Sequence, residues 1–232
     1  MTSSPPDWDL RSAELAGAAI GDGRPTAWFD ELYAEGAAGV IGVPWDRPAP
    51  LPPVVEHLRR RPPAAGSRAI VVGCGLGVDA EFLQDLGAGT QLEVTGFDIS
   101  ATAIELARTR HPDSTVDYRV GDLLDLPPHW LSAFDLVLEV INVQALPLEL
   151  RSAATRGVAS LVAPGGRLVV VENVREDEAA LSQRPPWGFS AADIDLFAVG
   201  GLRIESSEQY PMATHGPAAP RSRWLVEFSR QR

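Results

Sequence analysis

The stretch AIVVGCGLGVDAEFL, residues 69–83, decides the fold class of this chain. A short apolar run leads into three glycines in a G-x-G-x-G pattern, and a helical pattern follows directly. Gly73 and Gly75 can turn the chain and let a ligand approach the backbone, because glycine has no Cβ. The helix that begins near Gly77 offers free N–H groups and the positive end of its dipole. The stretch therefore predicts a first β-strand, a ligand-binding loop and a helix.

The glycine spacing separates two ligand classes that suit such a loop, a dinucleotide and S-adenosylmethionine. The dinucleotide fingerprint is G-x-G-x-x-G. Val78 stands where its third glycine belongs, so the residue for close helix–strand packing is missing. A nicotinamide-dependent oxidoreductase is therefore the less favoured of the two interpretations.

Strands and helices are predicted to alternate from residue 69 onward. This order implies right-handed crossovers and a mostly parallel sheet with helices on both faces. The predicted strands are 69–73, 92–97, 116–120, 134–140 and 166–172, and the helices between them are 77–87, 101–110 and 148–162.

The order changes after residue 172. FSAADIDLFAVGG, residues 189–201, predicts a helix with Ser190 as its N-cap and Gly200 at its end. LRIESSEQYP and SRWLVEFSR then predict two strands joined by the loop 211–221. That loop is too short for a crossover helix, so this last pair is expected to be antiparallel.

The segment before the glycine loop is expected to be helical. Helical patterns run from Asp9 to Ile20, through PTAWFDELYAEG and through PVVEHLRRR, with a Pro-rich ordered loop before the third. We expect one domain overall, with a helical cap or lid over residues 1–64 and the ligand-binding core over residues 65–232.

Composition excludes several function classes. The net charge is −11, which disfavours nucleic acid and anionic membranes as partners. All twenty basic residues are arginine, so Schiff-base lysine chemistry and a Walker-type loop are excluded. A single cysteine, an N-terminus unlike a signal peptide and short apolar runs predict a cytoplasmic protein. No metal site is expected.

Acidic residues follow the second, third and fourth predicted strands. Asp98 can accept hydrogen bonds from both hydroxyls of a ribose; alternatively, Asp98 or Ser100 caps the next helix. Asp122 can accept from an adenine amino group while Leu123 covers the ring, or it can form an Asx-turn. Glu139 and the residues up to Asn142 end the fourth strand. The carboxyl ends of parallel strands share one edge, so these side chains are predicted to border one crevice.

Five segments in order resemble the motifs of the class I S-adenosylmethionine-dependent methyltransferases. They are VVGCGLG, GFDIS, GDLLDLP, FDLVLE and LVAPGGRLVVVE, and the resemblance covers about residues 65–230. It implies a Rossmann-like seven-stranded sheet with an antiparallel last strand, and S-adenosylmethionine as cofactor. Carried over by motif, the implied cofactor-binding residues are Gly73, Cys74, Gly75, Gly77, Asp98, Ile99, Asp122, Leu123, Glu139 and Val140.

A narrower resemblance joins the chain to the thiopurine S-methyltransferase group. WFDELYAEG…VPWD before the core and PPWGFSAADIDLF after the fifth strand carry it. It implies that Trp28, Tyr33 and Trp45 close over the cofactor, and that Trp187 lines the substrate side. Trp28 can equally serve as core packing for its short helix. Trp45 is the better lid candidate, and its ring can contact a sulfonium by cation–π attraction.

The resemblance implies methyl transfer to a small molecule, with a thiol-type acceptor preferred. A thiol ionises near neutrality, so it needs no dedicated base. No catalytic base is identified, although His215 between the last two strands can reach a substrate pocket. Two alternatives stay open: an O- or N-methyltransferase of an aromatic metabolite, and a cofactor-binding partner protein without turnover.

Overall fold

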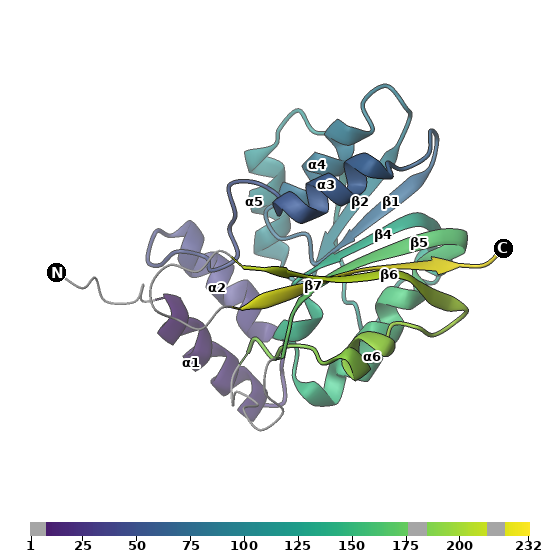
Figure 1. The fold of residues 1–232 in the computed structure, drawn as a ribbon. Helices are drawn as coiled ribbons and strands as arrows, with labels where there is room; N and C mark the ends of the chain where they lie inside the picture. Colours follow the sequence, from purple (N-terminus) through teal and green to yellow (C-terminus); the bar gives the residue numbers. More distant parts are fainter. Residues whose placement is uncertain (1–7, 176–184, 213–220) are drawn as a thin grey trace.

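A seven-stranded sheet with helices on both faces forms the body of the molecule (Figure 1). The computed structural model describes residues 8–175, 185–212 and 221–232. The strands are β1 (Arg68–Val72), β2 (Glu93–Asp98), β3 (Asp117–Val120), β4 (Phe134–Val140), β5 (Val162–Asn173), β6 (Leu202–Pro211) and β7 (Ser222–Arg230). The helices are α1 (Trp8–Gly21), α2 (Ala27–Ala37), α3 (Pro52–Arg60), α4 (Val78–Leu86), α5 (Ala101–Arg110), α6 (Leu148–Ser160) and α7 (Ala191–Asp195), with short 3-10 turns η1 (Pro128–Trp130) and η2 (Val143–Ala145).

The strand order confirms the predicted fold class. The sheet runs β3-β2-β1-β4-β5-β7-β6. The first five strands in this order pair in parallel, whereas β7 is antiparallel to both β5 and β6. The order reverses direction at β1 and β4, which is where ligands bind in open α/β sheets.

Alternating side chains of the strands build two cores, one on each face of the sheet. In β1, Ile70 and Val72 enter the core under α6 and α7, while Ala69 and Val71 enter the core under α3, α4 and α5. The period of two follows from the pleat of a strand. Both faces are covered by helices, so the central strands are apolar on both sides.

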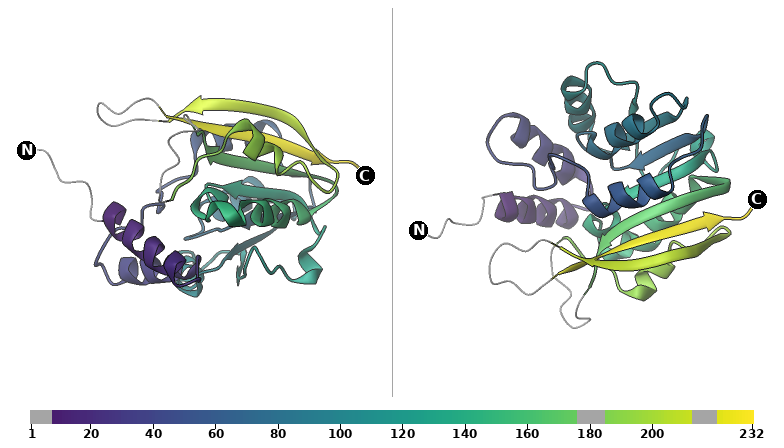
Figure 2. Two further views of the ribbon diagram at one scale, coloured as in Figure 1. Left: turned by 90° about the horizontal axis from the view of Figure 1, so that it is seen from below. Right: turned by 45° about the horizontal axis from the view of Figure 1, so that its top comes forward.

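The first two helices lie together beyond the carboxyl edge of the sheet (Figure 2). Asp30 of α2 accepts hydrogen bonds from the Ser100 hydroxyl at 2.6 Å and the Thr102 amide at 3.0 Å, at the start of α5. The hydrogen bond from Ser100 is the main reason that the pKa of Asp30 lies below its usual range. These bonds attach α2 to the sheet-bearing body. The third helix instead packs directly on the sheet through Val54 and Leu58, so the division at residue 64 stays a prediction.

The helix predicted over residues 189–201 is wrong in length. Ser190 is its N-cap and forms a capping box with Asp193, as predicted for the cap. The α-helix ends at Asp195, because Ala198 donates to the Asp195 carbonyl in a tighter turn and Phe197 is drawn fully into the core. The strand β5 also begins earlier than predicted, at Val162.

Among the residues that the structure describes, no helix combines the length and apolar character that a bilayer span requires.

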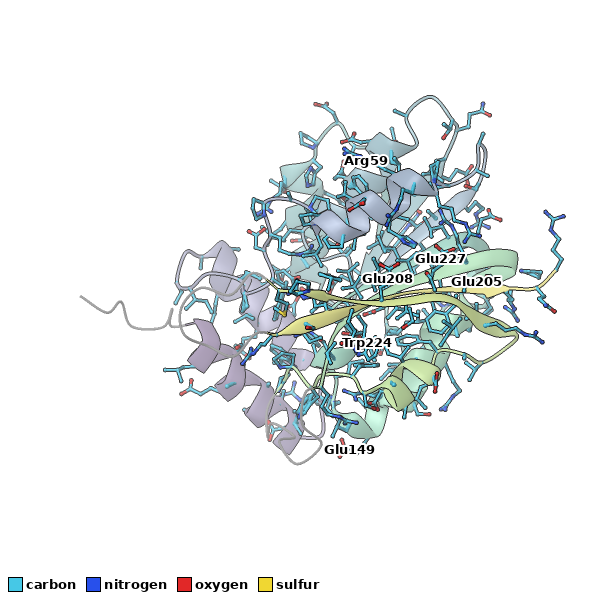
Figure 3. All side chains as sticks on the ribbon, in the orientation of Figure 1. Arg59, Glu149, Glu205, Glu208, Trp224 and Glu227 are labelled. Carbon is cyan, nitrogen blue, oxygen red and sulfur yellow. The ribbon has the colours of Figure 1, made fainter. Side chains whose placement is uncertain are left out.

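A buried carboxylate fastens α3 to the sheet. Glu227 of β7 is only 1% exposed, and its Oε2 lies 2.5 Å from His57 Nε2 and 3.4 Å from Arg167 Nη1. Arg61 also pairs with it. Burial opposes ionisation of Glu227, but the His57 contact and the two arginines outweigh it and hold the pKa below the usual range. Figure 3 shows Glu227 in the sheet close to the exposed Glu208 and Glu205.

We expect Glu227→Gln to lower the free energy of unfolding by about 1–2 kcal/mol at neutral pH, because charge-assisted hydrogen bonds are lost. The folded-state pKa lies below the ordinary 4.5, so this stabilisation is complete above that pH and disappears as the pH falls through the folded value. Urea denaturation at several pH values measures it. The matched control is Glu208→Gln, at an exposed position on β6, and it should change the free energy of unfolding little. Equal effects of the two substitutions would contradict a stabilising role of the Glu227 contacts.

Candidate active site

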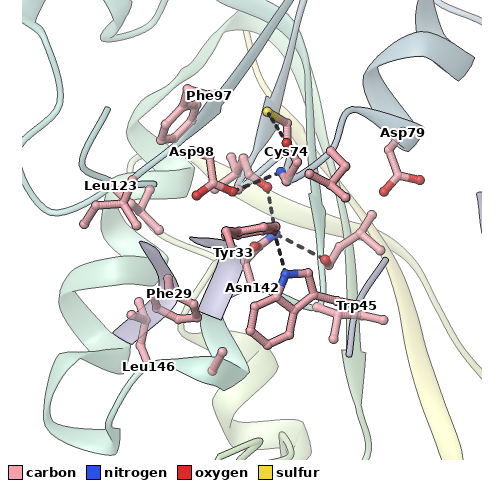
Figure 4. A pocket seen from close by; sticks show the side chains of 18 of the residues that line it. Phe29, Tyr33, Trp45, Cys74, Asp79, Phe97, Asp98, Leu123, Asn142 and Leu146 are labelled. Carbon is pink, nitrogen blue, oxygen red and sulfur yellow. Dashed lines mark hydrogen bonds between the residues drawn. The ribbon is translucent and has the colours of Figure 1, made fainter. Parts of the chain in front are cut away.

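A cavity of about 320 Å³ opens at the carboxyl edge of the sheet, between the sheet and α2 with its following loop (Figure 4). Its size falls in the range of small-molecule sites. Its lining residues come from α2 and the loop that follows it (the segment predicted as a lid), from the ends of β1, β2, β3 and β4, and from the starts of α4 and β7. They include Phe29, Tyr33, Trp45, Arg47, Gly73, Cys74, Gly75, Asp79, Phe97, Asp98, Ile99, Asp122, Leu123, Val140, Ile141, Asn142, Leu146 and Arg223.

The glycine loop forms the floor of this cavity. Gly73 and Gly75 have φ of 56° and 52°, in the left-handed region that favours glycine. A Cβ on Gly75 would lie 2.7 Å from the Tyr33 hydroxyl, and one on Gly73 would overlap the Asn142 amide. Both glycines are therefore required by conformation and by space. Burial raises the pKa of the Cys74 thiol well above its usual value, which disfavours a thiolate nucleophile.

Asp98 lies directly beside this loop. Its Oδ2 accepts the Gly75 amide at 2.9 Å and its Oδ1 accepts the Ser100 amide at 2.9 Å. Burial raises its pKa, against the opposing effect of these backbone donors. Each carboxylate oxygen has a second lone pair. The side chain lines the cavity, so a ligand with two neighbouring hydroxyls can donate to both oxygens. Asp98 itself does not cap α5, because the Ser100 hydroxyl fills that role.

An apolar slot adjoins Asp98. Phe97 and Leu123 line it together with Leu146, and Asp122 lies at its edge. Asp122 Oδ1 also accepts the Leu124 amide at 2.8 Å, which is the predicted Asx-turn. Its second oxygen is not used by this turn, so the turn and the adenine contact are compatible.

Aromatic rings from the lid close the cavity on the side away from the sheet. Trp45 Nε1 donates to the Tyr33 hydroxyl at 2.6 Å, and the two rings meet edge to face. Both line the cavity, as the sequence predicts, and Phe29 joins them. Trp28 does not: it is 2% exposed and packs between α1 and α2. The Trp28 ring stacks on the Phe29 ring, with the centroids 4.1 Å apart, and Phe29 lies between Trp28 and the cavity.

Three other predicted residues, Gly77, Glu139 and Trp187, do not line the cavity, and a fourth is not described. Gly77 faces the Tyr118 hydroxyl behind the loop, and Trp187 is buried where its carbonyl accepts from Arg151. Glu139 is fully buried under η2, where Oε1 accepts the amides of Asn142 at 2.8 Å and Val143 at 3.1 Å. His215 lies outside the described residues.

Glu139 supports the site from below. Burial raises its pKa to about 7. Burial also raises the pKa of its neighbour Glu172, which accepts the Gln144 amide at 3.1 Å. Through these bonds the pair orients Asn142, whose Nδ2 donates to the Val72 carbonyl at 2.7 Å. Glu139 is therefore a positioning residue for the end of β1.

Sequence reasoning missed several residues that line the cavity. Arg47 donates to Asp79 Oδ2 at 2.6 Å and joins the lid to the first turn of α4. Burial raises the pKa of Asp79, although Arg47 opposes this shift. Arg223 enters the cavity from β7. The local sequence gives no signal that Arg47, Asp79 or Arg223 lines the cavity. For Asn142, the position just after a predicted strand is a usable signal. In the part of the chain that the structure describes, no three His, Cys, Asp or Glu side chains are arranged to hold a metal ion.

Comparison with known proteins agrees with this geometry. Residues 69–166 match the family model described as a methyltransferase domain. The chain is 33% identical over 175 residues to the ubiquinone biosynthesis O-methyltransferase of Xanthomonas axonopodis pv. citri (strain 306), covering 72% of this chain and 67% of that one. The chain belongs to the class I S-adenosylmethionine-dependent methyltransferases.

Solved structures share the fold. One is the N-methyltransferase NodS from Bradyrhizobium japonicum WM9 with S-adenosylhomocysteine, at 20% identity and a TM-score of 0.61 over 87% of this chain and 99% of that one. Another concerns the conversion of a disulfide bond into a thioacetal group during echinomycin biosynthesis, at 26% identity and a TM-score of 0.68 over 89% and 91% of the two chains. S-Adenosylmethionine is thus the cofactor of this methyltransferase.

The lid contact makes a prediction for cofactor binding. We expect Tyr33→Phe to raise the Kd of the methyltransferase for S-adenosylhomocysteine about fivefold, because loss of the Trp45–Tyr33 hydrogen bond costs about 1 kcal/mol. Isothermal titration calorimetry measures it. The matched control is Tyr118→Phe, which removes a hydroxyl that donates to Glu81 at 2.5 Å, outside the cavity. If Tyr33→Phe, Tyr118→Phe and the wild type have a similar Kd, the Trp45–Tyr33 hydrogen bond does not contribute to cofactor binding.

Proposed function

We propose that this methyltransferase transfers a methyl group to the sulfur of a small thiol-type acceptor. In this proposal the ribose donates to Asp98, the adenine lies between Phe97 and Leu123, and the methionine chain passes over Gly73 and Gly75. The support is that these groups border one cavity. Bound S-adenosylmethionine supplies a sulfonium methyl group. The chain's own part is to align the acceptor with that group and to exclude water.

One observation carries the choice of acceptor. None of the described residues that line the cavity is a histidine. Cys74 is held as a thiol by burial, and Asp79 is paired with Arg47. An acceptor that ionises by itself near neutrality needs no base from the protein, and a thiol does so more readily than a phenol or an amine. The 26% identical structure that concerns a disulfide and a thioacetal also supports sulfur chemistry.

The aromatic lid supports kinship with the thiopurine S-methyltransferase group. Tyr33 and Trp45, which that resemblance implies as lid residues, line the cavity. We therefore include membership of the thiopurine S-methyltransferase group in the proposed function.

A phenolic oxygen is the second candidate acceptor. The 33% identical relatives are named ubiquinone biosynthesis O-methyltransferases, and this similarity favours an aromatic hydroxyl. Because a phenol is mostly protonated at neutral pH, its transfer requires a proton acceptor on the enzyme or an acidified phenol.

The pH dependence of kcat/KM separates these acceptors. For thiols we expect the rate to rise with the thiolate fraction, and the midpoint to follow the pKa of each thiol rather than that of an enzyme group. A series of aromatic thiols and phenols of graded pKa, assayed by formation of S-adenosylhomocysteine, measures this. A midpoint that stays fixed across the thiols, or turnover of phenols alone, would contradict a thiol acceptor.

A further inference from the structure

A polar corner of the cavity lies where the lid loop meets the start of α4 and the β6–β7 pair. It consists of Arg47 from the lid loop, Asp79 from α4, Tyr210 from β6 and Arg223 from β7. Arg47, Asp79 and Arg223 line the cavity. Tyr210 faces Arg223 across the β6–β7 pair, as the strand register requires.

Several polar atoms of this corner lack a partner among the described residues. Arg47 Nη1, Asp79 Oδ1 and the Tyr210 hydroxyl are buried without a hydrogen bond. Burial raises the pKa of Tyr210, so its hydroxyl stays protonated and available as a donor. The Arg223 side chain makes one hydrogen bond, from Nε to Asn173 Oδ1 at 3.1 Å, and no ion pair within the described residues. A buried polar atom left unpaired costs about 1–3 kcal/mol, so the corner is suited to a polar ligand group.

The sheet order assigns the Arg223 and Tyr210 side of this corner to the acceptor rather than to the cofactor. The residues proposed for the cofactor lie at the ends of β3, β2, β1 and β4, which are adjacent strands. Arg223 is on β7, two strands beyond β4. At about 4.8 Å per strand, that is on the order of 10 Å past the end of the cofactor-binding strands.

The charges of the corner favour an anion. Two guanidinium groups face one carboxylate, Asp79, and that carboxylate is paired with Arg47 at 2.6 Å. Within the described residues the Nη groups of Arg223 form no ion pair, and this fork matches the two oxygens of a carboxylate. The corner is thus locally cationic in a chain of net charge −11.

We propose that the methyl acceptor carries a carboxylate, which Arg223 binds through its Nη groups while the Tyr210 hydroxyl and Arg47 Nη1 donate to it. This inference rests on the proposed function and narrows its substrate class to carboxylated small molecules. The carboxylate anchors the acceptor beyond β4 and leaves its nucleophile facing the glycine loop.

Matched probes test the proposal. The assay compares para-mercaptobenzoate with para-thiocresol, and protocatechuate with para-methylcatechol, by kcat/KM for formation of S-adenosylhomocysteine. We expect the carboxylated member to be favoured about 10- to 150-fold, as hydrogen bonds to a charged group imply. Arg223→Gln should reduce this ratio to near one, mainly through KM, and leave the Kd for S-adenosylhomocysteine unchanged. The control Arg221→Gln removes an exposed arginine two residues away and should keep the ratio.

The other possible results also either support or contradict a carboxylate on the acceptor. Equal or better turnover of the uncharged probes, or an unchanged ratio in Arg223→Gln, would overturn it. If Arg223→Gln does not fold, Tyr210→Phe replaces it and should lower the ratio about fivefold. If no probe turns over, calorimetry with para-mercaptobenzoate and the S-adenosylhomocysteine-loaded enzyme decides: binding supports the inference, and no binding at millimolar concentration refutes it. Loss of the proposed function is seen separately, as failure to bind S-adenosylhomocysteine.

Discussion

Asp98→Ala is expected to raise the Kd for S-adenosylhomocysteine roughly 30- to 1000-fold, equivalent to about 2–4 kcal/mol. The substitution removes both acceptors proposed for the ribose hydroxyls. It also leaves the Gly75 and Ser100 amides without the oxygens that they now reach at 2.9 Å, so the glycine loop loses its support. Isothermal titration calorimetry with the purified chain measures the change.

Two variants separate binding from general damage at Asp98. Asp98→Asn keeps the shape and one acceptor oxygen, so an intermediate Kd is expected. Asp122→Ala removes another acidic side chain of the cavity, one that accepts from the Leu124 amide rather than from the glycine loop, and should raise the Kd tenfold or less. Urea denaturation verifies that each variant is folded. A folded Asp98→Ala protein with wild-type affinity would remove Asp98 from the site.

Most of the predicted residues that line the cavity lie at the ends of parallel strands. Gly73, Asp98 and Asp122 lie at or just after the ends of β1, β2 and β3, and parallel strands bring their carboxyl ends to one edge. Their local sequence therefore determined their place once the strands were recognised. The boundaries of β4, β6 and β7 were also predicted to the residue.

The errors concern positions that distant packing decides. The sequence shows aromatic residues on α2, but it does not show that Trp28 faces α1 while Phe29 faces the cavity. Glu139 ends a strand like Asp98, yet its partner Glu172 on β5 and the amides of η2 hold its carboxylate below the cavity. Arg223 lies outside every motif and Arg47 directly follows VPWD, and the antiparallel β7 and the lid loop bring both to the cavity.

Gly73→Ala is expected to lower the free energy of unfolding by about 3 kcal/mol and to abolish measurable cofactor binding. Alanine at the φ of 56° costs about 1–2 kcal/mol. Its Cβ would also overlap the Asn142 amide, which must then give up its hydrogen bonds to the Val72 and Val140 carbonyls, for a further 1–2 kcal/mol or so. The displaced amide would enter the cavity. Denaturant unfolding and calorimetry with S-adenosylhomocysteine measure the two effects.

Gly89→Ala is the matched control, because Gly89 has a φ of 77° and open space around its Cβ position. Gly89→Ala should lower the free energy of unfolding by the conformational cost alone, about 1–2 kcal/mol. Its Kd for S-adenosylhomocysteine should be unchanged. In the double variant Gly73→Ala/Asn142→Ala the overlap is gone, so the two substitutions should cost less together than the sum of their separate effects, by about 1 kcal/mol or more. Strict additivity would mean that Asn142 and the glycine loop do not touch. The fit of the loop to the end of β4 would then no longer explain why the cavity opens at this edge of the sheet.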